Sequence, residues 1–229
     1  MSEPLDDPVW SALGGPHARF ALSLGRARRY PADVSLFAAL AAPDPAALAD
    51  LAAIGSVEDA VALAGPAGAL ATAHGWRALF AFEVIQMVCD AKVAPPAHAP
   101  RELGSADVGE MAALVRATEP GPFAPRTIEM GLYVGVREGG RLLAMAGERL
   151  RPPGYTELSG VCTAPEARGR GLAEALVRAV VSGIQARGET PFLHVRAGSP
   201  SEGTATALYG RLGFRERRRT PLTILQRTR

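Results

Sequence analysis

Hydrophobic positions in the second half of the chain follow strand and helix patterns in turn. A strand-like run at 157–163 is followed by a helical pattern with a period of 3.6 at 172–187. A short apolar strand at 192–195 comes next, and a second helical pattern stops at Gly213, a residue suited to the position after a helix. An apolar strand at 222–225 completes the order. This alternation predicts an α/β layer.

The segment before this alternation predicts a helix and a β-hairpin. The helical pattern covers 108–117, with Ser105 as its N-cap. Two apolar runs, 132–136 and 142–145, flank a pair of glycines, which favours a tight hairpin turn. The second half therefore reads helix, hairpin, strand, helix, strand, helix, strand.

A glycine-rich turn joins the 157–163 strand to the helix that follows it. Such a turn lets the backbone approach a ligand, and the first helical turn then points free N–H groups at an anion, usually a phosphate. A dinucleotide fingerprint would need a third glycine where this chain has Glu174, and a Walker A loop would need Gly-Lys-Ser/Thr. A tight turn without a ligand is the alternative. The residues of the turn are Arg168, Gly169, Arg170, Gly171, Leu172 and Ala173.

The motifs of residues 103–226 resemble those of the GNAT superfamily of acyl-CoA N-acyltransferases. Arg168-x-x-Gly171-x-Ala173 matches the family turn [QR]-x-x-G-x-[GA]. The segment Ala205-x-x-Leu208-Tyr209-x-x-Leu212-Gly213-Phe214 is similar to the element that closes the family domain. The resemblance implies an α/β (α+β) fold: a mixed, mostly antiparallel sheet flanked by helices, with a smaller α/β region in front of it.

The resemblance also implies a cofactor, acetyl-CoA, and a reaction, acetyl transfer to a primary amine by direct attack on the thioester. In the family, backbone N–H groups of the turn, here those of 168–173, hold the pyrophosphate of coenzyme A. The strand before the turn carries a bulge, for which Gly160 is suited. The free backbone groups of that strand pair with the pantetheine arm, and here they belong to Val161, Cys162 and Thr163.

Two catalytic residues are implied by the same resemblance. Tyr209 would protonate the departing thiolate, since the ordinary pKa of a phenol, about 10, is near that of a thiol. Glu157 is the only carboxylate on its strand and matches the glutamate that some members use as a base. The alternatives are a core tyrosine and a surface glutamate. His194 and Glu148 are weaker candidates for proton transfer.

One residue departs from the family pattern. The family often has an asparagine before the closing helix, in contact with the cofactor, where this chain has Glu202. A carboxylate there would repel phosphates, so a non-catalytic acyl-CoA-binding or sensing module stays open as a second function.

The arginine-rich run at 215–219 is interpreted either as a solvated loop or as a contact to the phosphates of coenzyme A.

Composition excludes several classes of protein. The net charge of +2 gives no case for a nucleic-acid partner, and no apolar run reaches the about 18 residues that cross a membrane. The acidic segment 1–7 is unlike a signal peptide. We therefore expect a cytoplasmic protein with no nucleic-acid or membrane partner. Cys89 and Cys162 are expected to be buried thiols, and no cluster has zinc-ligand spacing, so no metal is expected.

The first half contains no motif that we can assign to chemistry. We expect an accessory α/β region at 1–92, a proline-rich linker at 93–102 and the acetyltransferase domain at 103–229. Asp44-Pro45 predicts a helix start, whereas periodicity leaves the apolar run at 79–88 open between strand and helix.

The accessory region has no second phosphate turn, so we do not expect it to bind coenzyme A. In related two-part proteins such a region is a degenerate copy of the same fold. We expect it to shape the site of the amine acceptor, a small molecule or a peptide, or to form the interface of a homodimer.

Overall fold

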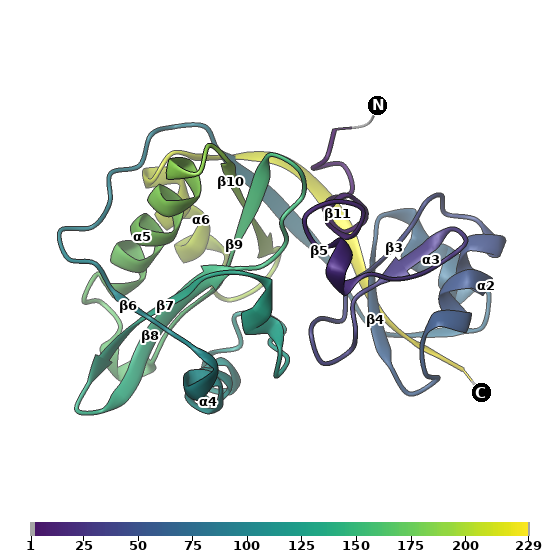
Figure 1. Cartoon of the computed structure of the whole chain (residues 1–229), viewed down its shortest axis with the longest axis horizontal. Helices are drawn as coiled ribbons and strands as arrows, with labels where there is room; N and C mark the ends of the chain where they lie inside the picture. The colour runs from purple at the N-terminus through teal and green to yellow at the C-terminus, as the bar shows by residue number, and fades with distance from the viewer. Residues whose placement is uncertain (1–2, 229) are drawn as a thin grey trace.

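An eight-stranded sheet organises the computed structural model, which describes residues 3–228 (Figure 1). The order of its strands is β4-β11-β5-β10-β9-β8-β7-β6. Strands β9 and β10 are the only parallel neighbours in this sheet, and the other neighbours are antiparallel. The predicted mixed, mostly antiparallel sheet is therefore confirmed.

The elements have the following bounds. The strands of the main sheet are β4 (Ala60–Ala64), β5 (Trp76–Cys89), β6 (Arg101–Glu102), β7 (Tyr133–Glu138), β8 (Arg141–Glu148), β9 (Tyr155–Thr163), β10 (Thr190–Arg196) and β11 (Phe214–Arg227). A second sheet contains β1 (Leu22–Leu24), β2 (Ala27–Arg29) and β3 (Ala38–Leu40). The α-helices are α1 (Pro8–Leu13), α2 (Pro45–Ile54), α3 (Pro66–Thr72), α4 (Val108–Thr118), α5 (Leu172–Ala186) and α6 (Glu202–Arg211). Short 3₁₀ helices are η1 (Ala18–Phe20), η2 (Ser105–Asp107), η3 (Thr127–Met130) and η4 (Pro165–Ala167).

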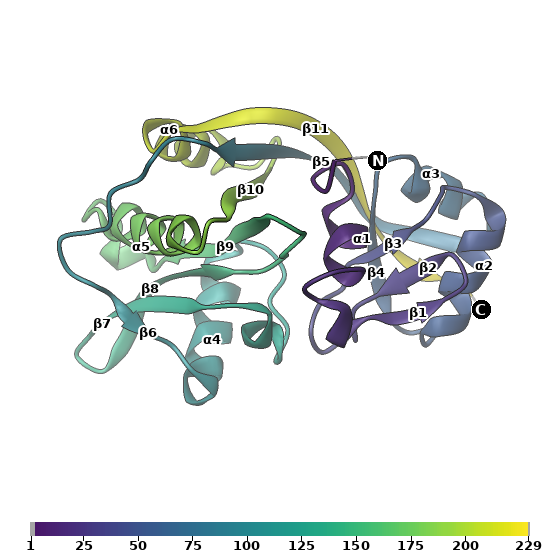
Figure 2. The ribbon, with the colours of Figure 1, turned by 45° about the horizontal axis from the view of Figure 1, so that its top comes forward.

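Helices cover both faces of the main sheet (Figure 2). Helix α5 lies on one face and contacts β8 and β9. It buries an unbroken apolar stripe that contains Leu176, Val180 and Ile184, and each such side chain contributes about 1.5–3 kcal/mol. Helix α4 lies on the opposite face, where Met111 and Leu114 pack with the buried residues of β7 and β8.

Local signals in the sequence agree with the structure at several points. The two-residue turn Gly139-Gly140 joins β7 to β8 with φ values of 55° and 81°, the left-handed backbone that a tight hairpin requires. Asp44 caps α2, because its Oδ1 accepts a hydrogen bond of 2.8 Å from the backbone N of Ala47. Cys89 and Cys162 are buried free thiols, as predicted.

Strand β5 comes from the first half of the chain but lies inside the sheet of the second half. It pairs with β10 on one side and with β11 on the other. Strands β5 and β11 run on together beyond β10 into the N-terminal half, where β11 also pairs with β4 (Figure 1). The segment 93–100 has no helix or strand, as its composition indicates, but the sheet crosses the boundary that we expected there.

The N-terminal segment covers the face of the sheet that lies opposite α5. Leu5, Leu13 and Tyr30 form one buried cluster with Leu150 and Phe192 of the second half. Residues 5–13 thus pack on the same face as α4. No helix within residues 3–228 has the length and apolarity to cross a membrane.

The insertion of β5 predicts that the second half does not fold alone. A fragment of residues 93–229 lacks β5, so β10 and β11 would each expose an unpaired strand edge. We expect this fragment to aggregate and to unfold without a cooperative transition, whereas the full chain unfolds cooperatively. Circular dichroism and size-exclusion chromatography measure both properties. A monomeric fragment with a cooperative transition would contradict the prediction.

A buried histidine predicts how stability depends on pH. Burial, together with nearby Arg19, lowers the pKa of His17 to about 4, from about 6.5 in an unfolded chain. The unfolded chain therefore binds this proton first, and the contribution of neutral His17 is complete above pH 6.5 and lost as the pH falls towards 4. We expect the free energy of unfolding in urea to fall by about 2 kcal/mol from pH 7 to pH 5. His17→Gln should remove this decrease, whereas replacement of the exposed His98 should leave it unchanged.

Candidate functional site

The predicted phosphate turn forms an uncapped helix N-terminus. Gly171 is the N-cap of α5, with φ 75° and no hydrogen bond from a side chain. The first bond of the helix runs from the N of Ala175 to the O of Gly171, at 3.1 Å. The N–H groups before Ala175 therefore have no acceptor within the helix. A Cβ atom added to Gly169 or Gly171 would meet no atom within 4 Å, so open space lies beside these glycines.

The arginines of the turn contact the protein. Arg170 forms an ion pair with Glu138 of β7. The Nε of Arg168 donates to the backbone O of Thr163 at 3.4 Å. Both side chains are exposed at the surface of the turn. The groups of this turn that are left without a protein partner are thus backbone N–H groups at the start of α5.

Strand β9 carries the predicted bulge and then separates from β10. Three steps along β9, from Ser159 to Cys162, match two steps along β8, and Gly160 has φ 62°. Pairing between β9 and β10 ends at Glu157 and Phe192, although both strands continue. The backbone groups of 161–163 that face β10 therefore have no partner on that strand. We call the gap after the Glu157–Phe192 pair the fork.

Tyr209 lies on α6, which packs against β10 and β11. Its ring belongs to the buried cluster around α5 and lies 5.7 Å from the ring of Phe214. Burial raises the pKa of its hydroxyl. That hydroxyl makes no hydrogen bond to any residue among 3–228, so a bound group would not have to displace a protein partner.

Glu157 is fully buried and ionised. Its Oε1 accepts from Nη2 of Arg149 at 2.8 Å and from Nδ1 of His194 at 2.7 Å. Its Oε2 accepts from Nε of Arg149 at 2.9 Å and from the N of Leu150 at 3.2 Å. Burial alone would raise the pKa of Glu157, but the Arg149 guanidinium and His194 hold that pKa well below its ordinary range.

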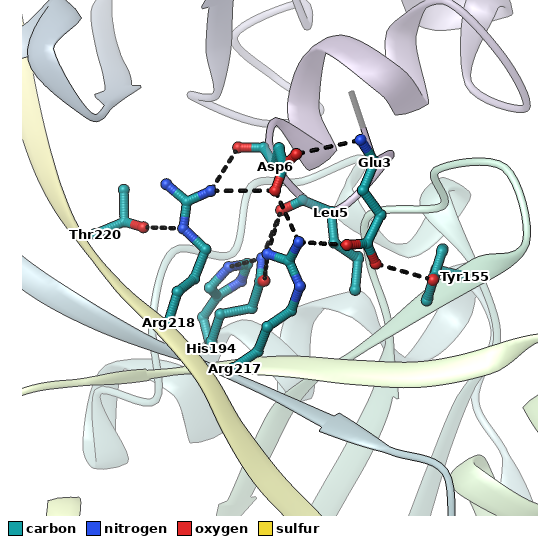
Figure 3. Close-up of polar contacts among 9 residues, drawn as sticks. Glu3, Leu5, Asp6, Tyr155, His194, Arg217, Arg218 and Thr220 are labelled. Atoms are coloured by element: carbon teal, nitrogen blue, oxygen red, sulfur yellow. Dashed lines mark hydrogen bonds and ion pairs between the residues drawn. The ribbon is translucent and has the colours of Figure 1, made fainter. Parts of the chain in front are cut away.

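Hydrogen bonds link Glu157 to His194 and continue from His194 to the N-terminal segment (Figure 3). Nε2 of Gln86 lies 3.3 Å from Nε2 of His194, and Nη1 of Arg217 donates to Oε1 of Gln86 at 2.9 Å. Arg217 also pairs with Glu3 at 2.6 Å and with Asp6 at 2.7 Å. No local pattern in the sequence reveals this network, because Gln86 lies in an apolar run and the carboxylates lie more than two hundred positions from Arg217 in the chain.

The arginine-rich run at 215–219 is part of β11, so its interpretation as a loop is wrong. Its side chains are paired with carboxylates of the protein. Arg215 pairs with Asp90 and Arg219 with Glu216. These guanidinium groups are therefore already neutralised, and the structure gives no support for a contact between this run and coenzyme A.

The other candidate carboxylates have partners inside the protein. Oε2 of Glu202 accepts from the backbone N of Gly198 at 2.6 Å and so closes the loop before α6. Glu148 is buried and forms an ion pair with Arg187 at 2.7 Å. Within residues 3–228, no group of three or more His, Cys, Asp or Glu side chains is arranged to hold a metal ion.

A small cavity of about 10 Å³ lies at the bulge of β9. Such a volume holds about one water-sized group. Ser159 and Gly160 form one wall, and Val115, Phe123 and Tyr133 close the others. The rings of Phe123 and Tyr133 meet edge to face, 5.7 Å apart. The sequence analysis did not name these residues, because their approach depends on the packing of α4 against β9.

The sequence and the fold are similar to those of known proteins. A model of the family called FR47-like protein matches residues 133–222. A solved structure from Novosphingobium aromaticivorans, assigned as an acetyltransferase of the GNAT family, shares 42% identity with a TM-score of 0.86, and the match covers 100% of both chains. A search of curated proteins gave no match.

More distant structures share the fold. A GCN5-related N-acetyltransferase from Kribbella flavida is 20% identical, with a TM-score of 0.63 and coverage of 96% of this chain and 93% of that one. A GCN5-related N-acetyltransferase-like protein from Streptococcus suis is 16% identical, with a TM-score of 0.55 and coverage of 96% and 92%. The similarity over the full length at 42% identity shows that the chain belongs to the GNAT family of acetyltransferases.

Proposed function

We propose that the protein transfers an acetyl group from acetyl-CoA to a primary amine by direct attack on the thioester. One observation carries this proposal: the fork between β9 and β10 leads to the uncapped N-terminus of α5. The fork offers strand backbone groups without a partner, and the N-terminus of α5 offers N–H groups without an acceptor. A ligand with an amide-containing arm and a pyrophosphate fits this pair of sites.

The residues of the turn would hold the pyrophosphate. The donors are the backbone N–H groups of 168–173, with the helix dipole of α5 behind them. The open space beside Gly169 and Gly171 leaves room for phosphate oxygens. The free backbone of Val161, Cys162 and Thr163 would pair with the pantetheine arm.

These two placements locate the reacting end of the ligand. A pantetheine arm that starts at the turn 168–173 and runs back along β9 would reach the bulge at Gly160. When bound, acetyl-CoA supplies an acyl thioester for attack by the amine. A backbone N–H at the fork would polarise the carbonyl, because a preorganised donor stabilises the developing oxyanion. Tyr209 would donate its proton to the departing sulfur.

The acceptor amine has to lose a proton during the reaction. Glu157 lies at the inner end of the fork and is the carboxylate that the sequence assigns to this task. Its ion pair with Arg149 leaves it a weak base on its own. We assign it as the anionic member of a pair with His194. The acceptor stays a prediction as a small-molecule or peptide amine, and the homodimer stays a prediction as well.

The second function, a non-catalytic acyl-CoA-binding module, rested on repulsion between Glu202 and the cofactor. The carboxylate of Glu202 accepts a hydrogen bond from the loop before α6, so the reason for that alternative is weakened. Acetyl transfer to amines separates the two functions.

The small cavity at Gly160 predicts a preference for the acetyl group. Its volume of about 10 Å³ suits a methyl group but not a longer chain. With a panel of a polyamine, an amino acid, a peptide N-terminus and an aminoglycoside, we expect thiol release from acetyl-CoA at least about tenfold faster than from butyryl-CoA, since overpacking costs 1–3 kcal/mol. Phe123→Ala should reduce this preference. Binding of acetyl-CoA without transfer to any amine would favour the non-catalytic module.

Tyr209 provides a second prediction. Tyr209→Phe keeps the buried ring and removes the proton donor. We expect turnover to fall about 10²-fold or more, with the affinity for coenzyme A in a thermal-shift titration unchanged. An unaltered turnover number would remove Tyr209 from the mechanism, and a loss of coenzyme A affinity would indicate a binding role instead.

A further inference from the structure

The acceptor positions of Glu157 are all occupied. A carboxylate offers about four lone-pair positions, and Glu157 accepts four hydrogen bonds: two from Arg149, one from the N of Leu150 and one from His194. Arg149 and Leu150 are themselves buried, and His194 is partly buried. A proton from the amine would have to displace one of these bonds. Another group at the fork is therefore better suited to receive it.

His194 lies at the fork. Strands β9 and β10 separate after Glu157 and Phe192, and His194 is the next residue of β10 on the same face as Phe192. Its ring meets the ring of Phe192 edge to face at 5.7 Å. Its side chain retains 17% exposure, whereas that of Glu157 retains none. Of Arg149, Glu157 and His194, His194 has the titratable ring nitrogen and the most exposed side chain.

The network determines which nitrogen of His194 carries the proton. Glu157 is an ionised acceptor, so Nδ1 of His194 must donate to it. Arg217 can only donate, so Oε1 of Gln86 faces Arg217 and the amide nitrogen faces the other way. That nitrogen donates to the O of Leu5 at 3.1 Å and meets Nε2 of His194 at 3.3 Å. The Nε2 atom of His194 therefore carries no proton, and its lone pair accepts the bond from Gln86.

We propose that His194, held as the neutral Nδ1–H tautomer between Glu157 and Gln86, accepts the proton of the attacking amine at Nε2. This inference rests on the proposed acetyl transfer and adds the residue that receives the proton. The contact from Gln86, at 3.3 Å, is longer than an ordinary hydrogen bond, so an amine can replace it. Glu157, at 2.7 Å, then stabilises the imidazolium.

Each bond and each proton in this acetyl transfer is accounted for. The C–N bond forms and the C–S bond breaks as the amine proton moves to Nε2 of His194. The sulfur takes the hydroxyl proton of Tyr209. His194 then releases its proton to solvent, and the phenolate of Tyr209 recovers one. No other reactant is needed.

Gln86 and Arg217 act as positioning residues. Arg217 orients the amide of Gln86, and Glu3 and Asp6 of the N-terminal segment hold Arg217 (Figure 3). The N-terminal segment thus fixes the tautomer of His194 through two intervening side chains. Hydrogen bonds link this ring, directly or through Gln86 and Glu157, to the charged groups Glu157, Arg149, Arg217, Glu3 and Asp6. The titratable groups His17, Tyr30 and Tyr133 interact electrostatically with Glu157.

The tautomer can be tested without a substrate. Two-bond ¹H–¹⁵N spectra of histidine-labelled protein distinguish a protonated from an unprotonated ring nitrogen, and replacement of the four histidines one at a time assigns the signals. We expect Nδ1–H and a bare Nε2 for His194 at pH 7.5. Gln86→Glu should add a proton at Nε2 while Nδ1–H is kept, because the ring then lies between two carboxylates that both accept. A wild-type ring with Nε2–H would overturn the proposal.

The catalytic role is tested by the pH dependence of kcat/KM with the most reactive amine of the panel. We expect His194→Gln to lower kcat/KM about 10²-fold or more and to abolish the acidic limb, with the KM for acetyl-CoA within twofold of wild type. Gln86→Glu should shift the acidic limb upward by about one pH unit. Arg217→Gln removes the group that orients the amide of Gln86, so we expect the acidic limb to extend over a wider pH range. Arg219 lies on the same strand but outside the network, so Arg219→Gln should leave the acidic limb unchanged.

The outcomes separate this proposal from the proposed function. A wild-type protein that binds acetyl-CoA but acetylates no amine contradicts the function. A wild-type protein that acetylates amines while His194→Gln keeps the wild-type pH profile contradicts only the role of His194. If His194→Gln shows no coenzyme A-dependent thermal shift, His194→Asn replaces it in the kinetic test, and the spectra of the wild-type ring decide the tautomer in either case.

Discussion

The candidate site depends on the separation of one pair of parallel strands in a sheet that is otherwise antiparallel. Strands β9 and β10 share backbone hydrogen bonds only up to Glu157 and Phe192. Beyond that point the bulge at Gly160 turns β9 away and exposes peptide groups that a regular sheet would satisfy internally. Helix α5 begins after the same strand, beyond η4 and the glycine turn, and its first N–H groups are a second set of unsatisfied donors. A ligand with matching acceptors can compensate both sets.

A buried polar network closes the inner end of the fork. Arg149, Glu157 and His194 lie between the strands and the N-terminal segment, where an isolated charge would cost several kcal/mol. Their hydrogen bonds are mutually satisfied, and this satisfaction restricts each group to one protonation state and one orientation. The arrangement therefore fixes a charge distribution at the place where the reaction needs one. It also makes residues 3–6 part of the surroundings of the site.

Sequence-based predictions are accurate where an element depends on residues close to it in the chain, and fail where it depends on distant ones. The period of 3.6 located α5, the glycine pair located the β7–β8 turn, and Asp44 located the start of α2, because each signal acts within a few residues. The apolar run of β5 was ambiguous, since only its pairing with β10 and β11 makes it a strand. The basic run was assigned to a loop for a similar reason: its carboxylate partners lie far away in the chain. For the site, the motif located the turn and Tyr209, whereas Gln86 and Phe123 entered only through tertiary contacts.

The position of β5 in the chain affects how the protein is made. Gln86 and His194, which face each other across β5 and β10, are 108 residues apart in the sequence. At about 5–20 residues per second, a ribosome delivers β10 on the order of ten seconds after β5. During that time a long strand at the centre of the final sheet has neither neighbour from the second half, and exposed strands of this kind associate with one another. The nascent chain therefore depends on the N-terminal helices, or on a chaperone, to keep β5 covered until the sheet can close around it.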